Sequence, residues 1–128
     1  GGMAIGMAGV GAIHAMEHPV SGLHNVTHGL GLAALTPEII SRTVPFAPAR
    51  CGDLSRALGG RNAQDLTAVL RAWMERLHVG VTLTPLGVVP QDVDWLAENC
   101  LKVSAASLHN HPVAFTIDEI RAIYRASL

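Results

Sequence analysis

The chain has few charged and few aromatic residues. Only 15% of its 128 residues are charged and 4% are aromatic, whereas 49% are hydrophobic, which excludes a disordered chain. Lysine and arginine do not outnumber aspartate and glutamate, so the formal net charge of -1 gives no field that would attract nucleic acid or an anionic bilayer. The length is sufficient for one domain with a single hydrophobic core.

Cysteine is also scarce. Cys51 and Cys100 are the two cysteines and lie far apart, with no C-x-x-C spacing, so they predict neither a zinc ribbon nor a disulfide framework. We expect both to be buried as small hydrophobic side chains, in a protein of the reducing cytoplasm.

Basic residues are absent from the N-terminal segment, residues 1–16, which is small and apolar. A signal peptide needs a basic region before its apolar run, and a membrane span needs about 20 apolar residues, so we expect neither. The chain opens with two glycines and has its first methionine at position 3. We therefore expect it to be part of a longer polypeptide.

Alternating strand patterns are lacking, and the apolar residues recur instead at helical spacing. We expect an all-α, helical bundle-like domain of five to seven helices over residues 1–128, without repeats or linkers. Asn62 or Gln64 can cap a helix over 62–79, and Thr116 with Glu119 forms a capping box for a helix that reaches Leu128. The other expected helices cover 4–18, ended by Pro19; 27–41, kinked or split at Pro37; 49–58; and 90–104. The aromatic residues Trp73, Trp95 and Tyr124 stand at core positions and predict packing.

The histidines of the chain are clustered in the sequence. Four of its seven histidines fall within the 15 residues from His14 to His28. His14 and His18 are four residues apart, so both rings project from one face of a helix. After a loop, His28 opens the next helix and returns toward the first. Two neutral imidazoles of this kind can bind a divalent ion, although hydrogen-bonded cap and loop histidines would give the same pattern.

The same residues also match H-x-x-E-H, the pattern of inverzincin metallopeptidases. In that interpretation His14 and His18 bind zinc, Glu17 activates water, and Glu75 or Glu98 supplies a third ligand. A second histidine pair, His109 and His111, has H-x-H spacing, but we expect an exposed turn there.

The stretch GAIHAMEHPVSGLHNVTHGLGLAALTP, from Gly11 to Pro37, resembles a signature of the iron-containing (group III) alcohol dehydrogenases. The likeness extends along the chain, through WLAENCLK near Trp95 and FTIDEIRAIY near the C-terminus. The resemblance implies that all 128 residues are the C-terminal helical part of a two-domain, dehydroquinate synthase-like architecture.

Carried over residue by residue, the resemblance makes His14 and His28 metal ligands and His18 the catalytic histidine near substrate and nicotinamide. His24 departs from the family pattern, in which this position is usually aromatic. The family's remaining ligands, an aspartate and a histidine spaced D-x-x-x-H, have no counterpart in this sequence.

The implied activity is metal-assisted hydride transfer between an alcohol or aldehyde and NAD or NADP, with Fe²⁺ or Zn²⁺ as the metal. The nucleotide would be bound mainly by an N-terminal nucleotide-binding domain outside this chain, because no strand followed by a glycine-rich phosphate loop is present. The resemblance also implies a homo-oligomer, and the fragment alone is expected to be inactive. The residues by themselves leave a non-catalytic helical binding or oligomerisation module as the alternative.

Overall fold

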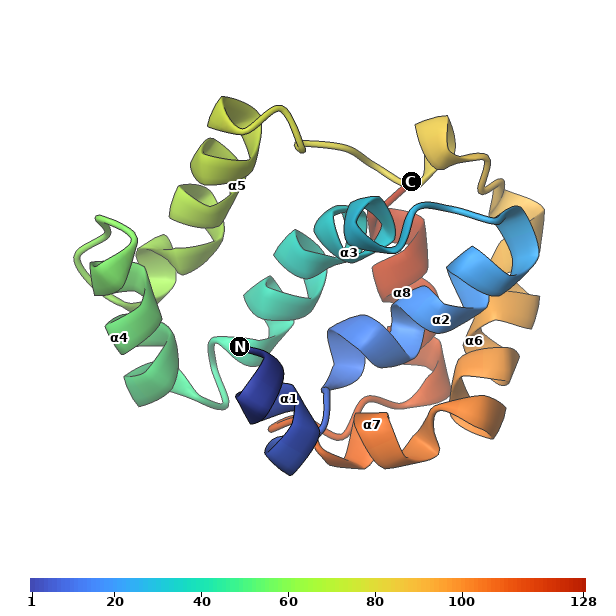
Figure 1. Ribbon diagram of the computed structural model, residues 1–128, viewed down its shortest axis with the longest axis horizontal. Coiled ribbons are helices and arrows are strands. Elements are labelled where there is room, and N and C mark those ends of the chain that lie inside the picture. Colours follow the sequence, from blue (N-terminus) through green and yellow to red (C-terminus); the bar gives the residue numbers. More distant parts are fainter.

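The structure is a computed structural model that describes all 128 residues as α-helices, short 3-10 helices and loops, without a β-strand (Figure 1). The all-α prediction is therefore confirmed. The α-helices are α1 (Gly2–Ala8), α2 (Ala12–His24), α3 (His28–Thr43), α4 (Pro48–Ala57), α5 (Leu66–Arg76), α6 (Val93–Val103), α7 (Ala105–His109) and α8 (Ile117–Ala126). The 3-10 helices are η1 (Ala63–Asp65), η2 (Thr84–Leu86) and η3 (Pro90–Asp92). Eight α-helices exceed the five to seven expected.

The single helix expected over 4–18 is wrong, because the structure divides it into α1 and α2 and extends α2 beyond Pro19. Gly9 takes a left-handed φ of 70° and ends α1, and α2 begins after the extended Gly11. α2 then continues through Pro19 to His24. Proline removes one backbone N–H from a helix interior, but Ala15, Met16 and Val20 around it are fully buried. Packing of this face outweighs the local preference for a helix end.

The loop between α2 and α3 is short and begins at Asn25, which adopts a left-handed φ of 52° and donates its N–H to the carbonyl of Ser21. α3 starts at His28, as expected, and contains Pro37 without being split. Because three residues connect the two helices, the start of α3 lies next to the second half of α2 (Figure 1).

The predicted caps are present. The Asn62 side chain accepts hydrogen bonds from the N–H groups of Gln64 and Asp65, at 3.0 and 3.2 Å. The Thr116 hydroxyl accepts from the Glu119 N–H, and the Glu119 carboxylate accepts from the Thr116 N–H at 2.7 Å. These bonds satisfy N–H groups that the first turn of a helix leaves unpaired.

The large cluster of buried side chains lies between α2, α3, α6 and α8 (Figure 1). Its centre includes Tyr124, which is fully buried as predicted and donates a 2.6 Å hydrogen bond to the carbonyl of Met16. The members are Ala12, Ala15, Met16, Val20, Ala34, Leu35, Ile39, Leu83, Val88, Val93, Leu96, Ala97, Cys100, Ile120, Ile123 and Tyr124.

The small cluster consists of Cys51, Ala63 and Leu66 and holds α4 and η1 against α5, at the left of Figure 1. Both cysteines are free and buried, as expected, and burial raises the pKa of Cys51 and raises that of Cys100 to about 12.

The packing predicted for Trp73 and Trp95 is wrong, because 38% of Trp73 and 46% of Trp95 are exposed. Trp73 lies along the surface of α5, where its indole N–H donates to the carbonyl of Leu58 and Arg76 covers its ring. Helical spacing therefore identified which face of each helix packs inward, but not how deeply the residues at the edge of that face are buried.

Helix α1 contributes no buried residue, and its Met3 and Met7 side chains are almost fully exposed. The Asn110 side-chain amide links the end of α1 to α7 by donating to the carbonyl of Ala8 at 2.6 Å. None of the helices combines the length and the apolar character that a membrane crossing would require.

Candidate functional site

The site lies where the exposed face of α2 meets the first turn of α3. His14 and His18 are on α2, and His28 is the first residue of α3. The opposite face of α2 is anchored in the large cluster through Ala12, Ala15 and other fully buried residues. The orientation of the histidine-bearing face is therefore fixed by the core.

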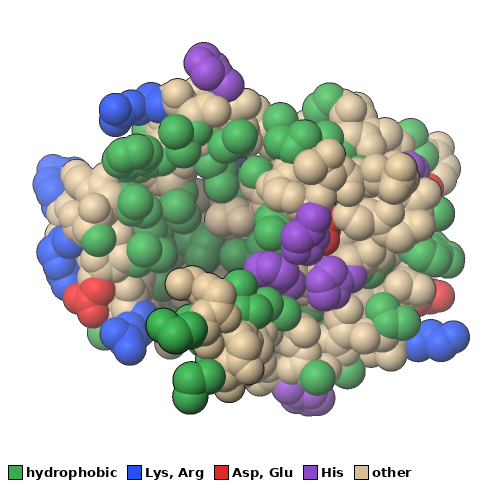
Figure 2. Space-filling view, viewed as in Figure 1, with side chains coloured by type: hydrophobic (Ala, Val, Ile, Leu, Met, Phe, Trp, Pro, Cys, Tyr) green, Lys and Arg blue, Asp and Glu red, His purple; other side chains and the backbone are tan.

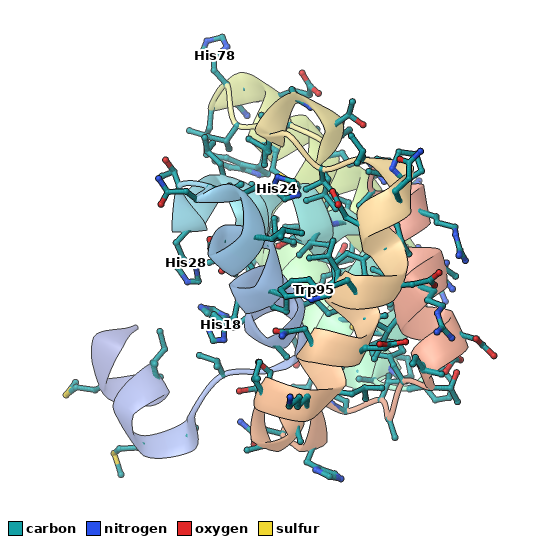
Figure 3. The ribbon with its side chains drawn as sticks, turned by 90° about the vertical axis from the view of Figure 1, so that its right-hand side faces the viewer. His18, His24, His28, His78 and Trp95 are labelled. Carbon is teal, nitrogen blue, oxygen red and sulfur yellow. The ribbon has the colours of Figure 1, made fainter.

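The structure brings the rings of His14, His18 and His28 together, as the spacing in the sequence predicts. The ring centroids lie 5.3 Å apart for His14 and His28, 5.8 Å for His18 and His28, and 6.2 Å for His14 and His18. We call these three residues the histidine cluster. Figure 2 shows histidine side chains gathered on one face of the molecule, and Figure 3 shows His18 and His28 on the same side.

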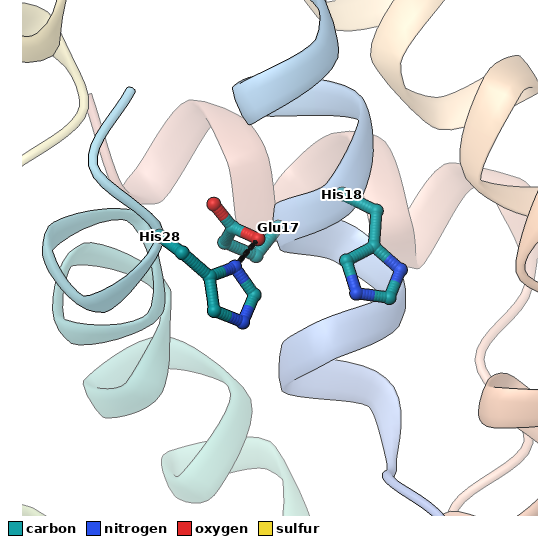
Figure 4. Close-up of side chains that lie close together, drawn as sticks. All are labelled: Glu17, His18 and His28. Atoms are coloured by element: carbon teal, nitrogen blue, oxygen red, sulfur yellow. Dashed lines mark hydrogen bonds and ion pairs between the residues drawn. The ribbon is translucent and has the colours of Figure 1, made fainter. Parts of the chain in front are cut away.

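Beneath the histidine cluster lies Glu17, which is fully buried, whereas half of the His28 side chain is exposed. One carboxylate oxygen of Glu17 pairs with Nδ1 of His28 (Figure 4), and the other accepts a hydrogen bond from the Ser21 hydroxyl. The candidate ligand atoms of Glu17, His18 and His28 lie within 4.8 Å of one another. No group of three that includes His14 meets this limit.

The electrostatic setting of His14 favours its neutral imidazole. Partial burial of His14, and then the charges of His28 and His18 when these are protonated, lower the pKa of His14 below its ordinary value. A metal ligand must offer an unprotonated ring nitrogen, so this shift favours the ligand form.

His24 is not part of the cluster. It lies at the far end of α2, where its Nε2 pairs with the Asp92 carboxylate at 2.8 Å beside the start of α6 (Figure 3). In place of an aromatic side chain, the chain thus has a polar link between α2 and the segment that leads into α6.

The exposed turn expected around His109 and His111 is correct only in part. His109 is exposed, but His111 is partly buried, stacks on Phe115 and lies 2.9 Å from the Thr43 hydroxyl. Burial lowers the pKa of His111. The short helix α7 and the packing of Phe115, neither of which was predicted, turn this ring inward.

The metallopeptidase interpretation does not fit the geometry. Both oxygens of Glu17 are engaged and shielded from solvent, which is unsuitable for a group that activates water. Glu75 and Glu98 are exposed on α5 and α6 and join no group of potential ligands with the histidines.

The donors that are present suit part of a divalent metal site. Imidazole nitrogens are typical ligands of iron and zinc. The Nδ1 of His28 is taken by Glu17, so its Nε2 is the nitrogen that could bind an ion. No further histidine, cysteine or aspartate lies close enough to these ligand atoms to join them.

The surface around the histidine cluster is open. The chain has three surface hollows, the largest about 390 Å³ and lined by residues of α7 and the end of α1, and none of them includes a residue of the cluster. The histidine cluster therefore lies outside the three surface hollows of this chain.

Comparison with known proteins agrees with the resemblance in the sequence. The model of the C-terminal part of the Fe-containing alcohol dehydrogenase family matches residues 1–128. Alcohol dehydrogenase 4 of Schizosaccharomyces pombe is 31% identical over 132 residues, a match that covers the whole chain and 31% of the relative. The 1,3-propanediol dehydrogenase of Klebsiella pneumoniae is 30% identical, with 97% of the chain and 34% of the relative covered.

Solved structures agree as well. An alcohol dehydrogenase from Oenococcus oeni superimposes with a TM-score of 0.91 at 26% identity, over 99% of this chain and 35% of that one. The chain belongs to the iron-containing alcohol dehydrogenase family. It spans about a third of the length of the relatives that it matches.

Proposed function

We propose that this chain is the C-terminal, helical, metal-binding domain of an NAD(P)-dependent oxidoreductase that interconverts alcohols and aldehydes. His14 and His28 act as ligands of Fe²⁺ or Zn²⁺, and His18 is the catalytic histidine beside the substrate. The observation that carries the proposal is the convergence of three imidazole rings from two helices, in a member of the iron-containing alcohol dehydrogenase family.

The assignment of the ligands is supported by the geometry. His14 and His28 form the closest ring pair, and the pKa of His14 is lowered. When bound, the divalent ion supplies Lewis acidity toward the oxygen of the substrate.

His18 has a different environment. Its side chain is exposed and stacks beside His28 with an interplanar angle of 19°. An exposed imidazole at this place can take up the hydroxyl proton of an alcohol and pass it to water, or return it when an aldehyde is reduced.

The open surface of the site supports a second domain. An N-terminal nucleotide-binding domain, facing the histidine cluster, would supply the missing ligands, hold NAD or NADP and exclude water from the cleft. The match of the chain to only about a third of each relative supports this division. We also propose that the whole protein is a cytoplasmic homo-oligomer.

The test uses the intact protein and measures metal content and turnover separately. His14→Ala and His28→Ala should each lose the metal, whereas His18→Ala should keep it and lose rate. The isolated chain should be inactive and bind metal weakly, because two histidine ligands make an incomplete shell. Unchanged metal content in the His14 and His28 variants would refute the ligand assignment, and tight stoichiometric metal in the isolated chain would refute the need for outside ligands.

A further inference from the structure

Glu17 is the only carboxylate of the chain that is fully buried. It lies on α2 between His14 and His18 in the sequence. An ionised carboxylate is costly to bury unless it is paired and hydrogen-bonded. Its presence under the histidine cluster therefore requires specific partners.

Those partners are provided by both helices. Ser21, one turn further along α2, donates its hydroxyl to one carboxylate oxygen and lies 3.1 Å from the carbonyl of Val26 in the loop. The other oxygen faces Nδ1 of His28 (Figure 4). Both oxygens of Glu17 are thus engaged by side chains of α2 and α3.

The space for the carboxylate comes from Gly31 on α3. A Cβ atom at this position would lie 2.7 Å from one oxygen of Glu17 and 2.8 Å from its Cγ, closer than side chains approach one another. Gly31 is a buried helix residue without a positive φ, so backbone conformation does not require glycine there. The glycine instead gives α3 the room to approach the carboxylate.

We propose that Glu17 is a positioning residue that fixes the tautomer and the direction of the His28 ring, an inference that rests on the proposed function. An ionised carboxylate accepts hydrogen bonds and donates none. A neutral imidazole that faces it must therefore carry its proton on Nδ1, which leaves the lone pair on Nε2. Figure 4 shows the other ring nitrogen of His28 turned away from Glu17. Ser21 donates a hydrogen bond to the carboxylate, and Gly31 leaves room for it. The carboxylate in turn orients the His28 ring so that Nε2 can bind the ion.

Two substitutions of Glu17 distinguish a role in orienting the His28 ring from a role in packing alone. Glu17→Gln retains an oxygen that can accept from Nδ1–H, whereas Glu17→Met keeps similar volume without an acceptor. Loss of a carboxylate partner of a ligand histidine typically weakens metal binding about 10- to 100-fold. We therefore expect about tenfold weaker zinc binding for Glu17→Gln and about 100-fold for Glu17→Met, measured by chelator competition on the intact protein.

The second readout does not depend on metal. In the metal-free intact protein labelled with ¹⁵N-histidine, the ring nitrogen shifts of His28 should report a proton on Nδ1. This signature should persist in Glu17→Gln and change to a mixture of tautomers in Glu17→Met.

The chain offers a matched control on the same helix. Asp92→Asn removes the carboxylate charge from the His24 pair, which lies outside the histidine cluster. Zinc affinity and the His28 signals should be unchanged in this variant.

An unchanged His28 tautomer in Glu17→Met would overturn the proposal, as would unchanged zinc affinity in a protein that binds zinc. If Glu17→Met does not fold, equal zinc affinity of Glu17→Gln and the parent protein would overturn it. Absence of zinc and iron binding by the parent protein would refute the proposed function instead, and the tautomer measurement would still decide the role of Glu17.

Discussion

The large and the small cluster of buried side chains differ in size and in what they support. Sixteen buried residues join α2, α3, α6 and α8, whereas three hold α4, η1 and α5 together. The histidine cluster stands on α2 and α3, directly above the large cluster. We call residues 48–76 the small region. Most of the buried side chains therefore lie beneath the candidate site, and we expect the small region to open at a lower free-energy cost than the large cluster.

Truncation of one leucine in each cluster should give the largest contrast. Leu96 and Leu66 are both fully buried. We expect Leu96→Ala to lower the free energy of unfolding by about 3–5 kcal/mol and Leu66→Ala by about 2–3 kcal/mol, because a site with few buried neighbours collapses more easily around a cavity. Urea unfolding measures both values. Hydrogen exchange should accelerate only in the small region for Leu66→Ala, and acceleration throughout α2 would show that the two regions open as one unit.

The same substitution at two buried helical glycines should have opposite signs. Gly31→Ala forces a Cβ atom against Glu17 and should destabilise the chain by about 2 kcal/mol. At Gly52 in α4, the nearest atom is the flexible Arg56 guanidinium at 3.4 Å, so Gly52→Ala should stabilise its helix by about 0.5 kcal/mol. Thermal unfolding of both variants tests this, and a stabilising Gly31→Ala would contradict the tight packing over Glu17.

Removal of a cap compares the two regions at the ends of their helices. Thr116→Ala removes the cap of α8, which packs in the large cluster, and should cost about 1 kcal/mol of global stability. Asn62→Ala should cost a similar amount, but within the small region only. Urea unfolding followed by tryptophan fluorescence can distinguish them in variants that keep either Trp73 on α5 or Trp95 on α6 as the single tryptophan. Equal responses of both tryptophans to Asn62→Ala would contradict local opening.

The smallest expected effect is a pH dependence confined to the large region. Residues 48–76 contain no histidine, whereas His111 lies against Thr43 and Phe115. Burial lowers the pKa of His111 below 6.5, so the unfolded chain binds more protons than the folded chain between the two pKa values. The stabilising contribution is present above pH 6.5 and is lost as the pH falls through the lower pKa of the folded form. His111→Gln should therefore lose less stability between pH 7 and pH 5 in urea unfolding. An equal loss in both proteins would assign the pH dependence to other groups.

The reach of local signals explains what could be predicted from the sequence. Local signals were sufficient for the all-α class, the Asn62 cap, the Thr116 box and the convergence of His14, His18 and His28. Signals that compete with packing were not: α2 passes Pro19 because its neighbours are buried, and Trp73 and Trp95 occupy the edges of their helical faces.

The candidate site was predictable in its exposed part only. The H-x-x-E-H pattern drew attention to Glu17 but suggested a base in contact with water, whereas the structure buries it beneath His28. Its true environment depends on Gly31, 14 residues further on, and on the close approach of α3. Gly31, three residues after His28, was the available signal in the sequence, and it gains meaning only when the packing of α3 against α2 is known.

The two cysteines are divided between the two clusters. Cys51 is in the small cluster and Cys100 in the large one, and burial keeps both thiols protonated and shielded. A thiol-specific reagent attacks the exposed thiolate, so each cysteine is modified only when its own surroundings open. The sequence thus has one cysteine that can be labelled in each cluster. The order in which the two cysteines react reports the order in which the two clusters unfold.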